Sequence, residues 1–151
     1  KRAIERKATE PKYFVRRLYT SASVSTRTRN KISREEALKT MMTVDEWYKL
    51  YDESGGRCAE TGIPFRFGKE NQLYQPSPDR IDVTKGYEIG NVRFVLSIIN
   101  RMRSDFELKL FREMCVFVVR ENPELFHVAT LPHLATRVDS DANQSYSKLQ
   151  K

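Results

Sequence analysis

Residues 79–103 constrain the fold more than any other stretch, because their pattern predicts four successive structural elements. Apolar and polar residues alternate over 81–83, which predicts a brief strand. The Lys-Gly pair at 85–86 predicts a turn, and the apolar run 91–95 predicts a returning strand. The apolar spacing then becomes helical as far as residue 103. The expected order is therefore strand, turn, strand and helix.

Two polar residues of this stretch, Asp79 and Asn100, are candidate metal ligands. A carboxylate at the end of one strand and an amide on the next helix can meet across a hairpin. Both supply oxygen ligands, which suit magnesium, calcium or manganese better than zinc. With arginines nearby, the candidate chemistry is phosphodiester hydrolysis. The alternative is that Asp79 caps a turn and Asn100 caps a helix.

The wider sequence carries an ordered set of motifs. It reads C-x-x-T-G-x-P-F from Cys58, S-x-D-R-I-D from Ser77, K-G-Y from Lys85, G-N-V-x-x-V from Gly90 and N-x-M-R from Asn100. This set resembles HNH endonucleases of the His-Me finger (ββα-metal) superfamily, most closely the phage and bacterial variants whose core reads D-R-I-D. The resemblance covers residues 58–103 and extends more loosely toward residue 11. It implies a ββα-metal core, one divalent ion (Mg²⁺ or Mn²⁺) and hydrolysis of DNA that leaves a 5′-phosphate.

The resemblance also implies roles for single residues. Asp79 and Asn100 would hold the metal ion, and Asn91 would tie the loop of the hairpin. Arg80 stands where the family usually places a histidine as the general base. An arginine stays protonated and cannot take a proton from water. It can instead hold the scissile phosphate and stabilise the charge that develops during phosphoryl transfer.

The general base of such a nuclease is left open by the residues. Asp82 is near in sequence, and Tyr74 and Tyr87 are alternatives. A tyrosine acts as a base only when its pKa falls well below about 10. Metal-bound hydroxide is a further alternative. The two histidines, His127 and His133, lie far downstream, where surface or core positions are expected for them.

The charge of the chain points to an anionic partner. Lys and Arg number 27 against 20 Asp and Glu, for a net charge of +7. Residues 1–42 hold 12 of these cations and four acids, whereas the remainder holds 15 and 16. This asymmetry predicts an arm that grips double-stranded DNA, the alternative being a solvated tail. The candidate DNA contacts are Lys85, Arg93, Arg101, Arg103, Arg27 and Arg29.

The remaining composition narrows the compartment and the cofactors. Two cysteines are too few for a disulfide framework, and no C-x-x-C pair is present, so we expect no structural zinc. Thr61 stands where a second zinc ligand would follow Cys58. The sequence has no apolar run of transmembrane length and no visible signal peptide. We therefore expect an intracellular, cytoplasmic protein of a phage or bacterium, with no membrane partner.

Local signals predict helices on both sides of the central stretch. Ser33 with Glu36, and Thr43 with Glu46, have the spacing of two capping boxes. Trp47 lies on the apolar face of the second helix, which favours a core position over base stacking.

Weaker signals lie nearer the two ends of the chain. A short helix is expected after Pro11, and the Ser/Thr/Arg-rich stretch 21–30 is expected either to contact phosphate oxygens or to form a polar loop. Ser104 is expected to cap the main packing helix, whose apolar stripe runs toward residue 122; binding of a partner is the alternative for this stripe.

Together these patterns predict an α+β fold in which a small ββα-metal core is flanked by N- and C-terminal helices. The expected parts are a basic arm and helical lead-in over 1–42, an HNH-like domain over 43–127 and a tail over 128–151. The predicted function is a metal-dependent DNA endonuclease. The alternative is a non-catalytic DNA-binding module on a degenerate HNH core, and an RNA-directed protein ranks last.

Overall fold

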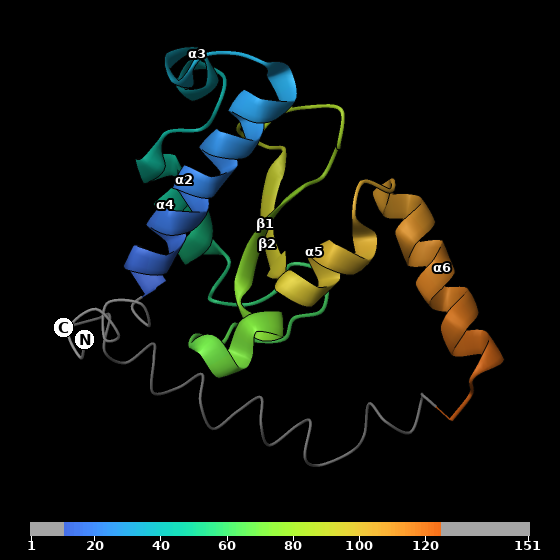
Figure 1. The fold of residues 1–151 in the computed structure, drawn as a ribbon. Coiled ribbons are helices and arrows are strands. Elements are labelled where there is room, and N and C mark those ends of the chain that lie inside the picture. Colours follow the sequence, from blue (N-terminus) through green and yellow to red (C-terminus); the bar gives the residue numbers. More distant parts are fainter. Residues whose placement is uncertain (1–10, 125–151) are drawn as a thin grey trace. The chain divides into compact units, whose positions relative to one another are not determined.

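Two short strands and the helix that follows them form the centre of the structure (Figure 1), a computed structural model that describes residues 11–124. Strand β1 (Pro76–Arg80) pairs with β2 (Val92–Leu96) in an antiparallel sheet, and α5 (Ser97–Arg103) follows directly. This order, together with the helices around it, confirms the α+β class. The chain divides into two units between Asp105 and Phe106, and each is described by itself.

Strand β1 lies upstream of the predicted strand over 81–83 and includes two prolines. Pro76 and Pro78 face Leu96 and Phe94 across the sheet. In an antiparallel pair, every second residue directs its N–H toward the other strand. Ile81, an odd-numbered position, donates its N–H to Asn91 O at 2.9 Å, so the even-numbered prolines are at positions whose N–H would point away from β2. Because the sheet has two strands, the missing N–H groups cost no ladder hydrogen bond.

Helix α2 (Pro11–Asn30) is longer than the short helix predicted, and the polar loop considered for 21–30 is wrong because this stretch is helical. Small side chains explain the difference. Ala22, Ser23 and Thr26 are buried, and the Thr26 hydroxyl donates to Ala22 O at 3.0 Å, so this hydroxyl keeps a hydrogen bond when it is buried. Val15 and Ala22 belong to the hydrophobic core. The described part of the predicted arm over 1–42 is therefore built into the unit that holds the sheet.

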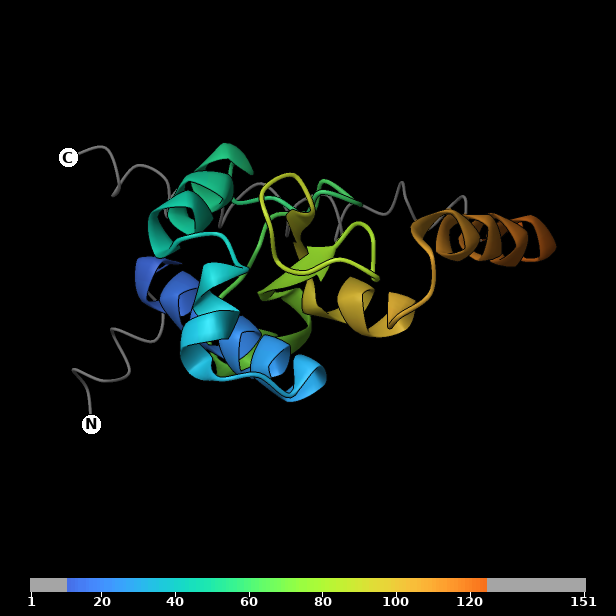
Figure 2. The ribbon, with the colours of Figure 1, turned by 90° about the horizontal axis from the view of Figure 1, so that it is seen from above.

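Helices α3 (Arg34–Lys39) and α4 (Val44–Glu53) begin where the capping boxes predicted. Trp47 on α4 is fully buried, which confirms its core position. Its ring contacts those of Tyr19, Tyr87 and Phe94 at centroid distances of 5.6, 5.8 and 5.8 Å. Figures 1 and 2 show α2 and α4 on one side of the sheet and α5 on the other.

The segment between α4 and β1 contains one isolated β-bridge, Arg57 with Pro64. Cys58 is buried, and its Sγ accepts from Leu96 N at 3.3 Å, which attaches this segment to β2. A 3₁₀ helix, η1 (Lys69–Tyr74), leads into β1.

The second unit contains α6 (Leu108–Glu121), where two predictions are wrong. Ser104 does not begin this helix; it ends α5 with a φ of 52°, and Glu107 stands at the N-cap of α6 without a side-chain cap. Phe111 is the one buried residue of the helix, so α6 is not the main packing helix of the described chain. Its exposed apolar residues include Leu110, Met114, Val116, Phe117 and Val118. None of the helices within 11–124 is both long and apolar enough to cross a membrane.

Candidate functional site

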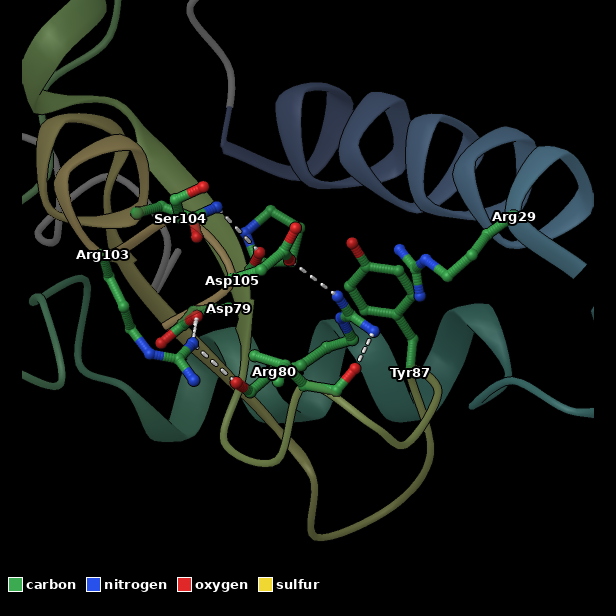
Figure 3. Close-up of a pocket in the computed structure, with 10 residues that line it drawn as sticks. Arg29, Asp79, Arg80, Tyr87, Arg103, Ser104 and Asp105 are labelled. Atoms are coloured by element: carbon green, nitrogen blue, oxygen red, sulfur yellow. Dashed lines mark hydrogen bonds and ion pairs between the residues drawn. The ribbon is translucent and has the colours of Figure 1, made fainter. Parts of the chain in front are cut away.

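Asp79 lies at the centre of the site and is almost completely buried, with 2% of its surface exposed. The sheet register places it directly opposite Arg93, whose Nε donates to Asp79 Oδ2 at 2.9 Å. Arg103, from the end of α5, forms an ion pair with the other oxygen, Oδ1 (Figure 3). Each carboxylate oxygen of Asp79 is therefore paired with the guanidinium group of an arginine.

The two arginines around Asp79 are themselves held from several sides. Arg103 is 1% exposed and donates to Arg80 O at 2.7 Å and to Ile81 O at 3.1 Å. Arg93 forms an ion pair with Glu60 at 2.5 Å. We call Glu60, Asp79, Arg93 and Arg103 the Asp79 cluster. It ties both strands, α5 and the segment before β1 together. Arg103 is buried, Arg93 is partly buried, and both are paired within the protein, so this conformation does not present them to DNA and their role as DNA contacts stays a prediction.

Asn100, the second predicted metal ligand, lines the same pocket as Asp79. Its Nδ2 donates to Ser77 Oγ at 2.8 Å and to Pro78 O at 3.2 Å. Asp79 and Asn100 thus lie at one site, as their spacing in the sequence predicted.

The oxygen atoms of these two residues, however, are not arranged to bind Mg²⁺ or Mn²⁺. A dication beside Asp79 would meet two guanidinium charges at hydrogen-bonding distance from the Asp79 carboxylate. Within residues 11–124, no group of three or more His, Cys, Asp or Glu residues could hold a metal ion.

Arg80 projects into the pocket next to the Asp79 cluster. Its Nη1 donates to Val83 O at 2.6 Å and to Lys85 O at 3.0 Å, and the Tyr87 ring lies 5.8 Å from the guanidinium carbon. Its Nη2 lies 3.4 Å from Oδ1 of Asp105, whose side chain is 85% exposed. Burial lowers the pKa of Arg80, and the charge of Arg29 lowers it further. The guanidinium remains charged at neutral pH.

A pocket of about 210 Å³ opens in front of Arg80. It is lined by Arg29, Pro78, Asp79, Arg80, Val83, Tyr87, Asn100, Arg103, Ser104 and Asp105. In Figure 3, Arg29 reaches from α2 toward Arg80. Asp79 is neutralised by its own arginines, so the free charges that face the pocket are Arg29, Arg80 and the exposed Asp105. The positive charges and N–H donors of Arg29 and Arg80 at this pocket suit an anion.

The loop after β1 supplies the carbonyl groups that hold Arg80, and Asn91 ties this loop. Its Oδ1 accepts from Asp82 N at 2.9 Å, and its Nδ2 donates to Asp82 O at 3.1 Å and Gly86 O at 2.8 Å. These bonds agree with the structural role expected for Asn91. Asp82 Oδ1 accepts from Thr84 Oγ1 at 2.6 Å and Thr84 N at 2.9 Å, and these bonds lower the pKa of Asp82. A carboxylate stabilised in this way is a weak base.

The other predicted contacts lie on the surface. Arg27 and Arg101 are exposed, and Lys85 is exposed with its Nζ 3.8 Å from Asp82 Oδ2. Of the alternative bases, Tyr87 lines the pocket and Tyr74 does not. His127 and His133, like the tail over 128–151, lie outside the described residues.

Sequence reasoning missed Glu60 and Asp105. Each lies far in sequence from the arginine it pairs with, 33 residues from Arg93 for Glu60 and 25 residues from Arg80 for Asp105. No local spacing rule connects residues so far apart. In the C-x-x-T-G motif, the cysteine is the residue that suggests a role from sequence, but it is Glu60 that forms an ion pair with Arg93 at the site.

Comparisons of the chain with models of protein families, with curated proteins and with solved structures found no match. The function is therefore argued from the site.

Proposed function

We propose that the protein is a non-catalytic DNA-binding module, built on a degenerate HNH-like core, whose pocket binds a backbone phosphate of double-stranded DNA. The observation that carries this proposal is the convergence of Arg29 and Arg80 on one pocket. Two like charges held close together repel, and an anion between them removes the repulsion. A phosphate supplies that anion with oxygen acceptors that match guanidinium geometry.

Arg80 is prepared to bind such a group. Its Nη1 is occupied by Val83 O and Lys85 O, which fix the plane of the guanidinium. Its Nη2 has the long contact of 3.4 Å with the exposed Asp105, which a phosphate oxygen can replace. A side chain positioned before binding loses little conformational freedom when the ligand arrives.

The same geometry argues against hydrolysis. Arg80 cannot take a proton, Asp82 is held by Thr84, and both oxygens of Asp79 are bound by arginines. The pocket therefore lacks a carboxylate that is free to act as a base or as a metal ligand in this conformation, apart from the exposed Asp105 at its edge.

Fluorescence anisotropy with a labelled DNA duplex, at a series of salt concentrations, tests this function. We expect salt-sensitive binding and a roughly tenfold loss of affinity in Arg80→Gln, because one charged hydrogen-bonding group contributes about 1.5–3 kcal/mol. The matched control is Lys49→Gln, which removes the same charge from an exposed site paired with Glu53. Absence of duplex binding at low salt, or equal affinities of the two variants, would contradict the proposal.

A metal-dependent endonuclease is the second candidate, favoured by the fact that Asp79, Arg80 and Asn100 line one pocket. It requires a conformation in which Asp79 is released from at least one arginine. Supercoiled plasmid incubated with EDTA, Mg²⁺ or Mn²⁺ separates the two functions. Cutting that needs the metal ion, and that disappears in both Asp79→Asn and Asn100→Ala, would replace the first proposal with the second. Circular dichroism of both variants shows whether they are folded.

A further inference from the structure

Helix α2 has an outer face that carries cations and no acid. The exposed residues of this face include Lys12, Arg16, Arg17, Thr20, Ser21, Arg27 and Thr28, and Lys31 follows the helix. No Asp or Glu occurs between Pro11 and Arg34. Over its 20 residues, at about 1.5 Å per residue, the helix is roughly 30 Å long. This length is close to the roughly 34 Å of one turn of duplex DNA.

These cations differ from four exposed lysines of the described chain in having no acidic partner among the described residues; the scattered exposed cations Arg34, Lys69 and Arg101 also have none. Elsewhere, exposed lysines pair with acids three or four residues away: Lys39 with Glu35 at 2.8 Å, Lys49 with Glu53 at 3.8 Å, Lys85 with Asp82 at 3.8 Å and Lys109 with Glu113 at 3.9 Å. In the part of the chain that the structure describes, no carboxylate forms an ion pair with Arg16, Arg17 or Arg27. Their charge is therefore free to act on a partner.

Helix stability does not account for this pattern. Cations stabilise the C-terminal end of a helix dipole, which covers Arg27 and Arg29 in the last turn. Lys12 stands in the first turn, where a cation is unfavourable, and Arg16 and Arg17 lie far from the C-terminal end. A local explanation thus fails for three of the five cations of the helix.

The orientation of α2 connects this face to the pocket. Arg29 follows the buried Thr26 by three residues and the buried Ala22 by seven, so it lies on the inward side of the helix. Because the helix continues past the core at this end, Arg29 lines the pocket rather than the core (Figure 3). Arg27, two residues earlier, lies on the outer face.

We propose that the outer face of α2 docks on the sugar–phosphate backbone of double-stranded DNA and leads that backbone to Arg29 and Arg80. This inference rests on the proposed function and adds the path of the DNA. Guanidinium and ammonium groups bind the phosphates, and the hydroxyls of Thr20, Ser21 and Thr28 are additional donors to phosphate oxygens. These contacts carry no base specificity, so they position the duplex without reading its sequence.

The test is the salt dependence of duplex binding by the full chain. The variant Arg16→Gln/Arg17→Gln/Arg27→Gln is compared with Lys39→Gln/Lys49→Gln/Lys69→Gln, which removes the same net charge from exposed sites outside α2. Each phosphate contact contributes about 0.9 to the slope of log affinity against log salt. We expect the α2 variant to lose about two to three units of slope and at least tenfold in affinity at low salt, and the control to retain the slope. Circular dichroism checks that both variants are folded.

Each outcome separates this inference from the proposed function. Equal slopes for the α2 variant and its control, with wild-type binding intact, would overturn the docking surface and leave the pocket standing. Failure of the wild-type protein to bind duplex DNA would overturn both. Tighter binding to duplex RNA, or to vesicles with anionic lipids, than to duplex DNA would overturn the choice of partner.

Discussion

Two pairs of arginines stand side by side in this protein and differ in what surrounds them. Arg93 and Arg103 are buried against Asp79, and each is bound by further acceptors from the protein. Arg29 and Arg80 face a pocket, and the acid nearest to Arg80 is an exposed one at 3.4 Å. The first pair holds the strands and α5 in place, whereas the second pair is free to bind an anion.

This difference teaches that residue type alone does not separate structural from binding arginines. A buried ion pair that is held by several hydrogen bonds contributes to the position of the elements and is costly to break on one side. An arginine that is fixed by carbonyl groups but has a weak ionic partner keeps its capacity for a ligand. The two pairs therefore predict opposite results: loss of stability for the first, and loss of DNA affinity with stability retained for the second.

The largest effect is expected for Asp79→Ala. The substitution leaves Arg93 and Arg103 buried without their shared carboxylate, and breaking a buried pair on one side costs about 3–5 kcal/mol of unfolding free energy. Chemical denaturation followed by circular dichroism measures the loss. If Asp79→Ala does not fold, Asp79→Asn, which retains one acceptor, makes the loss measurable. A decrease below about 1 kcal/mol in both variants would show that the Asp79 cluster does not hold the fold.

The next largest effect is expected for Asn91→Ala, which should lower both stability and DNA affinity. Asn91 holds the loop whose carbonyl groups accept hydrogen bonds from Arg80. Asn91→Ala leaves Asp82 N and Gly86 O without their partners, which costs about 1–3 kcal/mol of stability. We expect DNA affinity to decrease as well, because Arg80 loses its fixed orientation. Denaturation and duplex binding measured on the same preparation test both effects. Unchanged affinity in a destabilised Asn91→Ala protein would show that the loop does not position Arg80.

A smaller effect on binding alone is expected for Arg29→Gln. Its side chain is exposed, with one hydrogen bond to Ser25 Oγ at 3.2 Å, so its removal leaves no buried group unpaired. Loss of one phosphate contact predicts an affinity three- to tenfold lower and a salt slope lower by about one. Thermal unfolding provides the control. A large decrease in the unfolding temperature would place Arg29 with the structural pair instead.

The smallest effect, of opposite sign, is expected for Asp105→Asn. This acid is the exposed partner of Arg80, and removing its charge frees Arg80 Nη2 for a phosphate. We expect a two- to fivefold gain in duplex affinity at low salt, which salt screening reduces. The control is Asp45→Asn, a neutralised acid in the exposed first turn of α4. Equal gains in the two variants would show that Asp105 acts only through net charge.

The helices α2 and α6 show where prediction from the sequence stops. Residues 21–30 contain six Ser, Thr or Asn residues and read as a loop, yet they are helical because Ala22, Ser23 and Thr26 are small enough to be buried within the unit that holds the sheet. The apolar stripe of α6 reads as core, yet most of it is exposed. Periodicity identifies a face of a helix, but the surface that covers the face belongs to a distant part of the chain.

The sequence by itself determined the order of strand, strand and helix, both capping boxes, the burial of Trp47 and the meeting of Asp79 and Asn100 at one pocket. These follow from contacts over a few residues, or from a hairpin and helix of set length. Only the tertiary structure decided that Asp79 is neutralised and that Arg80 is not. Asp79 is neutralised by Arg93 and Arg103, whereas Arg80 has only the exposed Asp105. Glu60, which also pairs with Arg93, and Asp105 come from segments that no local pattern connects to the sheet. The interaction energy of two charges depends on their distance in space, so the whole fold sets which carboxylates each arginine interacts with.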